Sequence, residues 1–168
     1  MHVEIRNETA ADVEAIDAVT TAAFLTAPHS DHTEQFIVKA LRKAGKLAVS
    51  LVAEADGKVV GHVAVSPVSI SDGAVGWYGL GPISVLPEHQ GQGIGGRLMN
   101  AALQALRERG AAGCVVLGEP GYYGRFGFQV EPRLVLAGVP AGYFQAVSFG
   151  EAMLCGVVTY EESFRARG

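Results

Sequence analysis

A glycine-rich segment contains the residues of this chain best suited to bind a ligand. Glycine occupies positions 91, 93, 95 and 96, after an apolar run that ends at Val85 and before a segment with helical periodicity. Glycine reaches positive φ angles and has no Cβ to obstruct a ligand, so consecutive N–H groups can point at one anion. The free N–H groups and the dipole at a helix start add to this attraction. The pattern predicts a binding site for a phosphate or pyrophosphate.

Two well-known phosphate-binding motifs match this segment only in part. Residues 91–96 fit the dinucleotide pattern G-x-G-x-x-G, and Glu119 follows at the distance of a ribose-binding acid. However, residues 86–90 separate the preceding strand from the first glycine, and the rest of the chain is too short for the remaining crossover units of that fold. A P-loop needs Lys and Ser or Thr where Arg97 and Leu98 stand. A nicotinamide-dependent oxidoreductase stays open as an alternative.

A third pattern accounts for this segment and for a second one. Gln90-x-x-Gly93-x-Gly95 resembles the acyl-CoA-binding loop Arg/Gln-x-x-Gly-x-Gly/Ala of the GCN5-related N-acetyltransferase (GNAT) family. Residues 122–128 resemble the Tyr-x-Arg/Lys-Phe-Gly-Phe element of the same family, after a stretch long enough for one helix and one strand. Gly79-Leu-Gly-Pro and residues 117–128 are similar to a bacterial branch of predicted acetyltransferases of the YhbS type. The resemblance covers about residues 3–160.

The resemblance implies both a co-substrate and a reaction. Acetyl-CoA is the expected co-substrate, without a metal, and the expected reaction is acetyl transfer to a primary amine of a small molecule or peptide by direct attack in a ternary complex. In this family the strand that ends near Val85 separates from the next parallel strand, and the pantetheine arm pairs with its free backbone groups. The implied cofactor-binding residues are Ile83, Val85, Gln90, Gly91, Gln92, Gly93, Ile94, Gly95, Gly96 and Arg97. A non-catalytic acyl-CoA-binding module on the same fold is the alternative.

The resemblance also assigns catalytic roles. Tyr123 corresponds to the family's general acid, which stabilises the departing thiolate, whereas the adjacent Tyr122 is expected to pack in the core. Glu34 borders the acceptor site as a base or acceptor contact, and helix capping is an alternative role for it. His29, Asp31, His32 and Glu34 crowd into one turn without a distant partner, which indicates a polar loop rather than a metal site.

Composition limits the other possibilities. With 168 residues, 49% of them apolar, the chain fits one domain, 1–168. A net charge of −4 argues against nucleic acid as a partner, and no apolar run is long enough to cross a membrane. Because no secretion leader is evident, we expect a cytoplasmic protein. Cys114 and Cys155 lie in apolar strand-like runs and are expected to be reduced structural thiols. Exposed edge strands make a homodimer plausible.

The elements that must position these residues follow from hydrophobic periodicity and from turn residues. Helices are predicted over residues 9–24, 33–44 and 94–109, and strands over 3–6, 47–55, 58–68, 75–85, 113–117, 143–149 and 155–160. Gly45 and Gly110 end the second and third helices. The apolar strand 113–117 is expected to pair in parallel with the strand before the glycine segment. The predicted fold class is α+β in the GNAT arrangement, a mostly antiparallel mixed sheet with a central βαβ crossover and flanking helices.

Overall fold

The structure is a computed structural model that describes residues 2–25, 27, 30, 32–140, 142–150 and 155–167. Its strands are β1 (Val3–Asn7), β2 (Val49–Ala55), β3 (Lys58–Ile70), β4 (Trp77–Val85), β5 (Gly113–Leu117), β6 (Leu134–Val135), β7 (Phe144–Ser148) and β8 (Gly156–Tyr160). Its helices are α1 (Val13–Leu25), α2 (Glu34–Ala44), α3 (Ile94–Glu108) and α4 (Pro120–Tyr123). Within the described residues, no helix is both long and apolar enough to span a bilayer.

One mixed sheet organises the molecule. The strand order is β1-β2-β3-β4-β5-β7, and β8 pairs with the end of β3 and with β6. Strands β4 and β5 are parallel and α3 connects them, whereas the other pairs along the main path are antiparallel. This arrangement confirms the predicted fold class and the central crossover.

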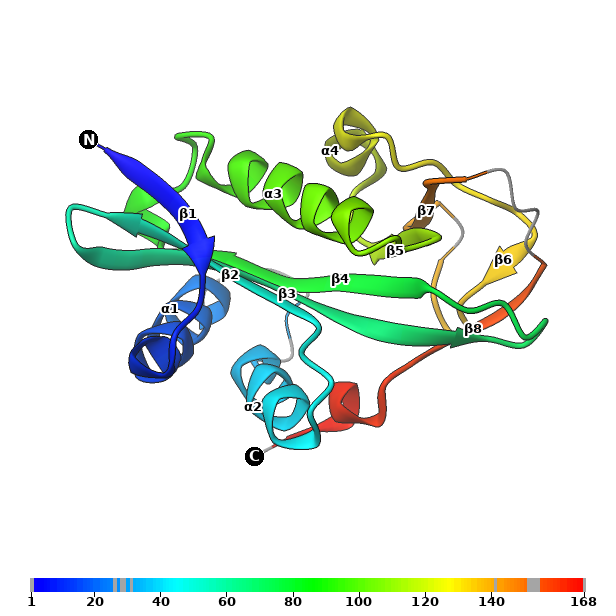
Figure 1. Cartoon of the computed structure of the whole chain (residues 1–168), viewed down its shortest axis with the longest axis horizontal. Coiled ribbons are helices and arrows are strands. Elements are labelled where there is room, and N and C mark those ends of the chain that lie inside the picture. Colours follow the sequence, from blue (N-terminus) through cyan, green and yellow to red (C-terminus); the bar gives the residue numbers. More distant parts are fainter. Residues whose placement is uncertain are drawn as a thin grey trace.

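Helices cover both faces of the sheet (Figure 1). Helix α3 lies on one face, and α1 and α2 lie on the other. In each of α1, α2 and α3, apolar residues recur at helical spacing and therefore form one side of the helix. This side packs against the sheet and is buried. The buried set includes Ile16, Val19, Val38, Leu41, Leu98, Met99, Ala102, Leu103 and Leu106. The two layers fix the start of α3 beside the end of β4 and the end of α1 beside the middle of β4.

The structure differs from the predicted elements mainly in the second half of the chain. The short strand β6 and the one-turn helix α4 were not predicted, since each is too short to show a periodic pattern. Cys155 precedes β8 and is exposed, so its placement inside a strand is wrong, whereas Cys114 is buried in β5. Both thiols are free. The turn predicted just after Gly150 lies largely outside the described residues.

Strand β4 loses one of its two partners about a third of the way along its length, and this partner change shapes the site. Its first residues pair in parallel with β5, and the last such pair is Gly79 with Val115. Beyond this pair, β4 keeps only β3 as a partner among the described strands. A bulge lies at the same point, because Gly81 and Pro82 stand opposite Ala64 alone. Since proline cannot donate a ladder hydrogen bond, β4 and β5 separate beyond Gly79.

A buried ion pair fixes β1 to the start of the first helix, and it makes stability depend on pH. Asp12 is 7% exposed and accepts hydrogen bonds from Arg6 at 2.7 and 3.0 Å and from the N–H of Thr9 at 2.7 Å. The hydrogen bond from Arg6 is the main cause that holds the pKa of Asp12 well below its ordinary value. A depressed pKa stabilises the fold above the unfolded-state value of about 3.9, and this contribution is lost as the pH falls through the folded-state value.

We therefore expect Asp12→Asn to lower the free energy of unfolding at pH 7 by about 1–3 kcal/mol, the usual range for hydrogen bonds to a charged group. Urea titrations at pH 7 and below pH 3.5 measure this effect, and the difference from wild type should shrink at the lower pH. Substitution of the exposed Glu88 by glutamine serves as the control. An equal loss at both pH values would contradict the assignment of the effect to the carboxylate charge.

Candidate active site

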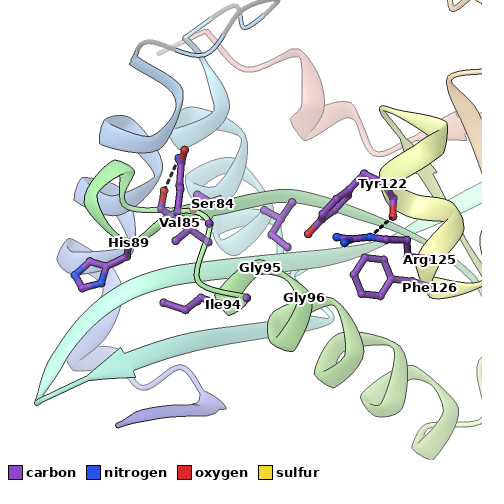
Figure 2. A pocket seen from close by; sticks show the side chains of 13 residues that line it. Ser84, Val85, His89, Ile94, Gly95, Gly96, Tyr122, Arg125 and Phe126 are labelled. Carbon is purple, nitrogen blue, oxygen red and sulfur yellow. Dashed lines mark hydrogen bonds between the residues drawn. The ribbon is translucent and has the colours of Figure 1, made fainter. Parts of the chain in front are cut away.

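A cavity of about 680 Å³ lies where the opened end of β4 meets the first turn of α3. Figure 2 shows this cavity, with Tyr122, Arg125 and Phe126 on one side of the helix start and His89 on the other. Its wall comes from four segments, namely the end of β4, the loop after it, the start of α3 and the segment that begins with α4. The lining residues are Ile83, Ser84, Val85, His89, Gln90, Gly91, Gly93, Ile94, Gly95, Gly96, Tyr122, Arg125 and Phe126.

The glycine loop presents free donors to this cavity. Gly91 and Gly93 have φ angles of 77° and 82°, a left-handed conformation that favours glycine. Among the hydrogen bonds of the described residues, none is donated by the N–H groups of residues 91–96, and the first in this region runs from Arg97 to the Gly93 carbonyl. No acidic side chain lies in the first turn of α3. A diphosphate fits this set of free donors and the positive end of the helix dipole.

The opened edge of β4 offers further hydrogen-bonding groups. Leu86 donates its N–H to the Val60 carbonyl of β3 at 2.9 Å, and consecutive strand residues direct their backbone groups to opposite sides. The groups of Ile83 and Val85 therefore face away from β3. In agreement, Gln90 Nε2 donates to the Val85 carbonyl at 3.0 Å on that side (Figure 2). An extended arm with amide groups, such as pantetheine, fits this edge.

Most of the predicted cofactor-binding residues come together in the structure, but two do not line the cavity. Arg97 directs its guanidinium to the Val3 carbonyl at 2.8 Å, because this side of α3 faces β1. Gln92 is exposed at the tip of the loop. The sequence assigns no ligand role to Arg125, and it leaves His89 either close to the phosphates or simply exposed in its loop. Only the position of Arg125 inside the Tyr-Phe-Gly-Phe element could have pointed to it.

Arg125 supplies the positive charge of the cavity. Its guanidinium carbon lies 4.7 Å from the ring centroid of Tyr122 and 5.6 Å from that of Phe126. Its Nε atom donates to the Tyr122 carbonyl at 3.4 Å, so further donors are free to reach an anion. His89 adds a buried Nδ1 atom that has no partner among the described residues. These two side chains complement the anionic part of acetyl-CoA.

We expect Arg125→Gln to raise the Kd for acetyl-CoA about fivefold at low salt, because one partly exposed charge interaction is worth about 1 kcal/mol. The increase should shrink as the ionic strength rises. Isothermal titration calorimetry at two salt concentrations measures both effects. Arg133→Gln is the matched control, since Arg133 pairs with Glu131 outside the cavity. An unchanged Kd at low salt would show that Arg125 does not face the co-substrate.

A second cavity of about 480 Å³ lies on the other side of Ile83, which lines both. Tyr123 and Glu34 also line it. Glu34 is the first residue of α2 and accepts a hydrogen bond from the Ser30 hydroxyl at 2.9 Å. The predicted acid and the predicted base or acceptor contact thus share one cavity, next to the cavity of the glycine loop.

The two adjacent tyrosines face different cavities. Tyr122 lies over the start of α3, where a Cβ added to Gly95 would come within 3.1 Å of its hydroxyl. The expectation that Tyr122 packs in the core is therefore wrong. Tyr123 packs against Gly118, where an added Cβ would come within 2.4 Å of the ring. Its hydroxyl has no hydrogen-bond partner among the described residues, and burial raises its pKa to about 12.

Other polar residues considered from the sequence lie elsewhere. His29 and Asp31 are outside the described residues, and His32 Nδ1 lies 2.9 Å from the Phe24 carbonyl. His62 is fully buried in β3 and forms a 2.7 Å hydrogen bond with Ser50, and burial lowers its pKa to about 4. Across the part of the chain that the structure describes, no cluster of His, Cys, Asp or Glu could hold a metal ion.

A sheet opened beside a glycine-rich helix start, with Ile83 lining a cavity on each side, fits an acyl-CoA-dependent transferase. Comparison with known proteins agrees. A family model described as an acetyltransferase (GNAT) domain matches residues 46–130. The uncharacterized N-acetyltransferase YhbS of Escherichia coli K12 is 39% identical over 127 residues, which are 75% of this chain and 73% of that protein. The chain therefore belongs to the GNAT family of acetyl-CoA-dependent N-acetyltransferases.

Solved structures show the same arrangement with the co-substrate bound. A GNAT acetyltransferase from Brucella melitensis in complex with acetyl-CoA is 49% identical, with a TM-score of 0.87 over 97% of this chain and 98% of that one. The E. coli YhbS structure in complex with CoA has a TM-score of 0.90 and 32% identity over 100% of this chain and 94% of that one. These matches support the assignment of acetyl-CoA as the co-substrate.

Proposed function

We propose that this protein transfers the acetyl group of acetyl-CoA to a primary amine of a small molecule or peptide, by direct attack while both substrates are bound. The observation that supports this proposal most is that Ile83 lines both cavities, so they lie next to each other. One cavity has the free donors of the glycine loop, and the other has Tyr123 and Glu34. Holding two reactants in adjacent, oriented positions can lower a barrier by about 7–11 kcal/mol.

Residues of this chain bind the two substrates and take up the proton of the amine. The N–H groups of residues 91–96, together with Arg125, bind the diphosphate, and the edge at Ile83 and Val85 pairs with the pantetheine amides. The Glu34 carboxylate holds the protonated amine and takes up its proton, directly or through water. The amine nitrogen then bonds to the acetyl carbonyl carbon and loses its second proton to solvent, while the C–S bond breaks and its electron pair moves to sulfur.

Tyr123 stabilises the sulfur by donating a hydrogen bond. The pKa of its phenol is raised to about 12, whereas a thiol has a pKa of about 8.5, and one unit of difference corresponds to 1.36 kcal/mol. Complete proton transfer from Tyr123 to the thiolate is thus uphill by about 5 kcal/mol. The sulfur finally takes its proton from solvent. Because a raised pKa keeps the phenol protonated, Tyr123 produces no alkaline loss of activity below about pH 11.

The experiment that tests this function measures free thiol released from acetyl-CoA with a panel of amines, polyamines and peptides. Mass spectrometry of the N-acetyl product identifies the acetylated atom, and calorimetry measures acetyl-CoA binding on the same protein. We expect binding together with amine-dependent thiol release. Binding without turnover of any acceptor would favour a non-catalytic acyl-CoA-binding module on this fold.

A further inference from the structure

Among its described lining residues, the second cavity has one negatively charged side chain in an apolar wall. Its described lining residues include apolar side chains from α1, α2, β4, β5 and the segments near β6 and the C-terminal end, among them Phe24, Ile37, Leu80, Leu117, Leu136 and Phe164. Glu34 is the one charged side chain among those residues. The other polar groups are the hydroxyls of Tyr123 and Tyr160, which are neutral, since burial raises the pKa of both.

The charges of this wall limit the charge of the acceptor. An ammonium group that leaves water needs a counter-charge, and Glu34 supplies one. A second ammonium on the same ligand would face apolar side chains or neutral phenols. The Tyr160 hydroxyl is buried and has no partner among the described residues, so it offers no counter-charge to a second ammonium. Diamines, polyamines and lysine-rich peptides therefore fit poorly.

We infer that the acceptor is a primary monoamine with a compact apolar body, either an alkyl chain or an aromatic ring. This inference rests on the proposed function and assigns the substrate class of the same site. The ammonium group lies at Glu34, and the apolar body packs against the side chains of α1, β5 and the segment after β6. The cavity of about 480 Å³ also receives the acetyl end of the co-substrate, which restricts the body to a small one.

Two compounds of equal size test whether the enzyme prefers monoamines to diamines. Hexylamine and 1,5-diaminopentane differ by the replacement of a terminal methyl group with a second ammonium group. We expect kcat/KM for hexylamine to exceed that for 1,5-diaminopentane at least tenfold. In the series from propylamine to hexylamine, kcat/KM should rise by up to about fourfold per methylene group, as expected for about 0.8 kcal/mol of apolar burial.

A variant that adds a second carboxylate to the wall tests the charge argument directly. Ala137 lines the cavity and is exposed, so Ala137→Glu removes no buried contact. We expect Ala137→Glu to lower the ratio of kcat/KM for hexylamine to kcat/KM for 1,5-diaminopentane at least threefold. Val135→Glu is the matched control, because Val135 is 49% exposed nearby and is not among the lining residues. The control should keep the wild-type preference.

The outcomes separate the substrate class from the proposed function. Faster turnover of 1,5-diaminopentane, spermidine or a lysine peptide than of hexylamine would overturn the monoamine class and leave amine acetylation intact. Equal effects of Ala137→Glu and Val135→Glu would also overturn it, because the cavity wall would then not select the charge. Acetyl-CoA binding without turnover of any amine would instead overturn the proposed function, and the substrate class with it.

Discussion

Replacing Tyr123 by phenylalanine is expected to lower kcat at least tenfold and to leave the Kd for acetyl-CoA within about twofold of wild type. The substitution removes one hydroxyl and keeps the ring that packs on Gly118. Removal of one hydrogen-bond donor to a developing negative charge typically lowers kcat about 10²–10³-fold. Because Tyr123 lines the second cavity rather than the cavity of the glycine loop, binding of the diphosphate should not change. Steady-state kinetics with a saturating amine, together with calorimetry, measure the two quantities.

Two further variants show whether the hydroxyl acts by its position. Tyr122→Phe removes the neighbouring hydroxyl, which faces the start of α3, and should leave kcat nearly unchanged. Gly118→Ala keeps Tyr123 but pushes its ring away, because the added Cβ would come within 2.4 Å of it. We expect Gly118→Ala to lower kcat, as Tyr123→Phe does. A kcat of wild-type size in Tyr123→Phe would remove Tyr123 from the reaction, whatever the other variants do.

Substituting alanine for Gly93 is expected to raise the Kd for acetyl-CoA at least tenfold. Gly93 is the residue before α3 and has a φ angle of 82°, and a non-glycine residue there costs about 1–2 kcal/mol. An added Cβ meets no protein atom within 4 Å, so the fold tolerates it. The loop relieves the strain by shifting its backbone, and the N–H groups of residues 91–96 then no longer point at one anion. Isothermal titration calorimetry measures the loss.

Gly110→Ala separates this effect from a general loss of stability. Gly110 ends α3 with a φ angle of 75° and also has open space around it, so the backbone cost is the same. In thermal unfolding without ligand, the melting temperatures of the two variants should fall by similar amounts. Only Gly93→Ala should bind acetyl-CoA more weakly. Equal affinities of both variants would show that the glycine loop does not hold the co-substrate.

The parts of the site that depend on backbone conformation could be predicted from the sequence. A positive φ angle restricts the residue type, so the glycines at positions 91 and 93 identify the loop from residue type alone. The apolar strand 113–117 likewise identifies the parallel crossover, because a strand buried on both faces has no alternating pattern.

The direction of single side chains could not be predicted in the same way. Neighbouring residues on a helical turn point about 100° apart, and the sequence does not say which of Tyr122 and Tyr123 faces which cavity. The second cavity could not be predicted either, since single residues from segments between Phe24 and Phe164 line it, and these segments share no motif. Arg97 and Arg125 show the same limit: both are arginines near the loop, but only Arg125 turns toward it.

The partner change in β4 links the stability of the protein to the supply of its co-substrate. Without a ligand, the part of β4 beyond Gly79 has an unpaired edge, to which an extended ligand with amide groups can add as a strand would. At a concentration one hundred times its Kd, such a ligand raises the free energy of unfolding by about 2.7 kcal/mol. We therefore expect acetyl-CoA to raise the stability of this protein as well as to take part in its reaction.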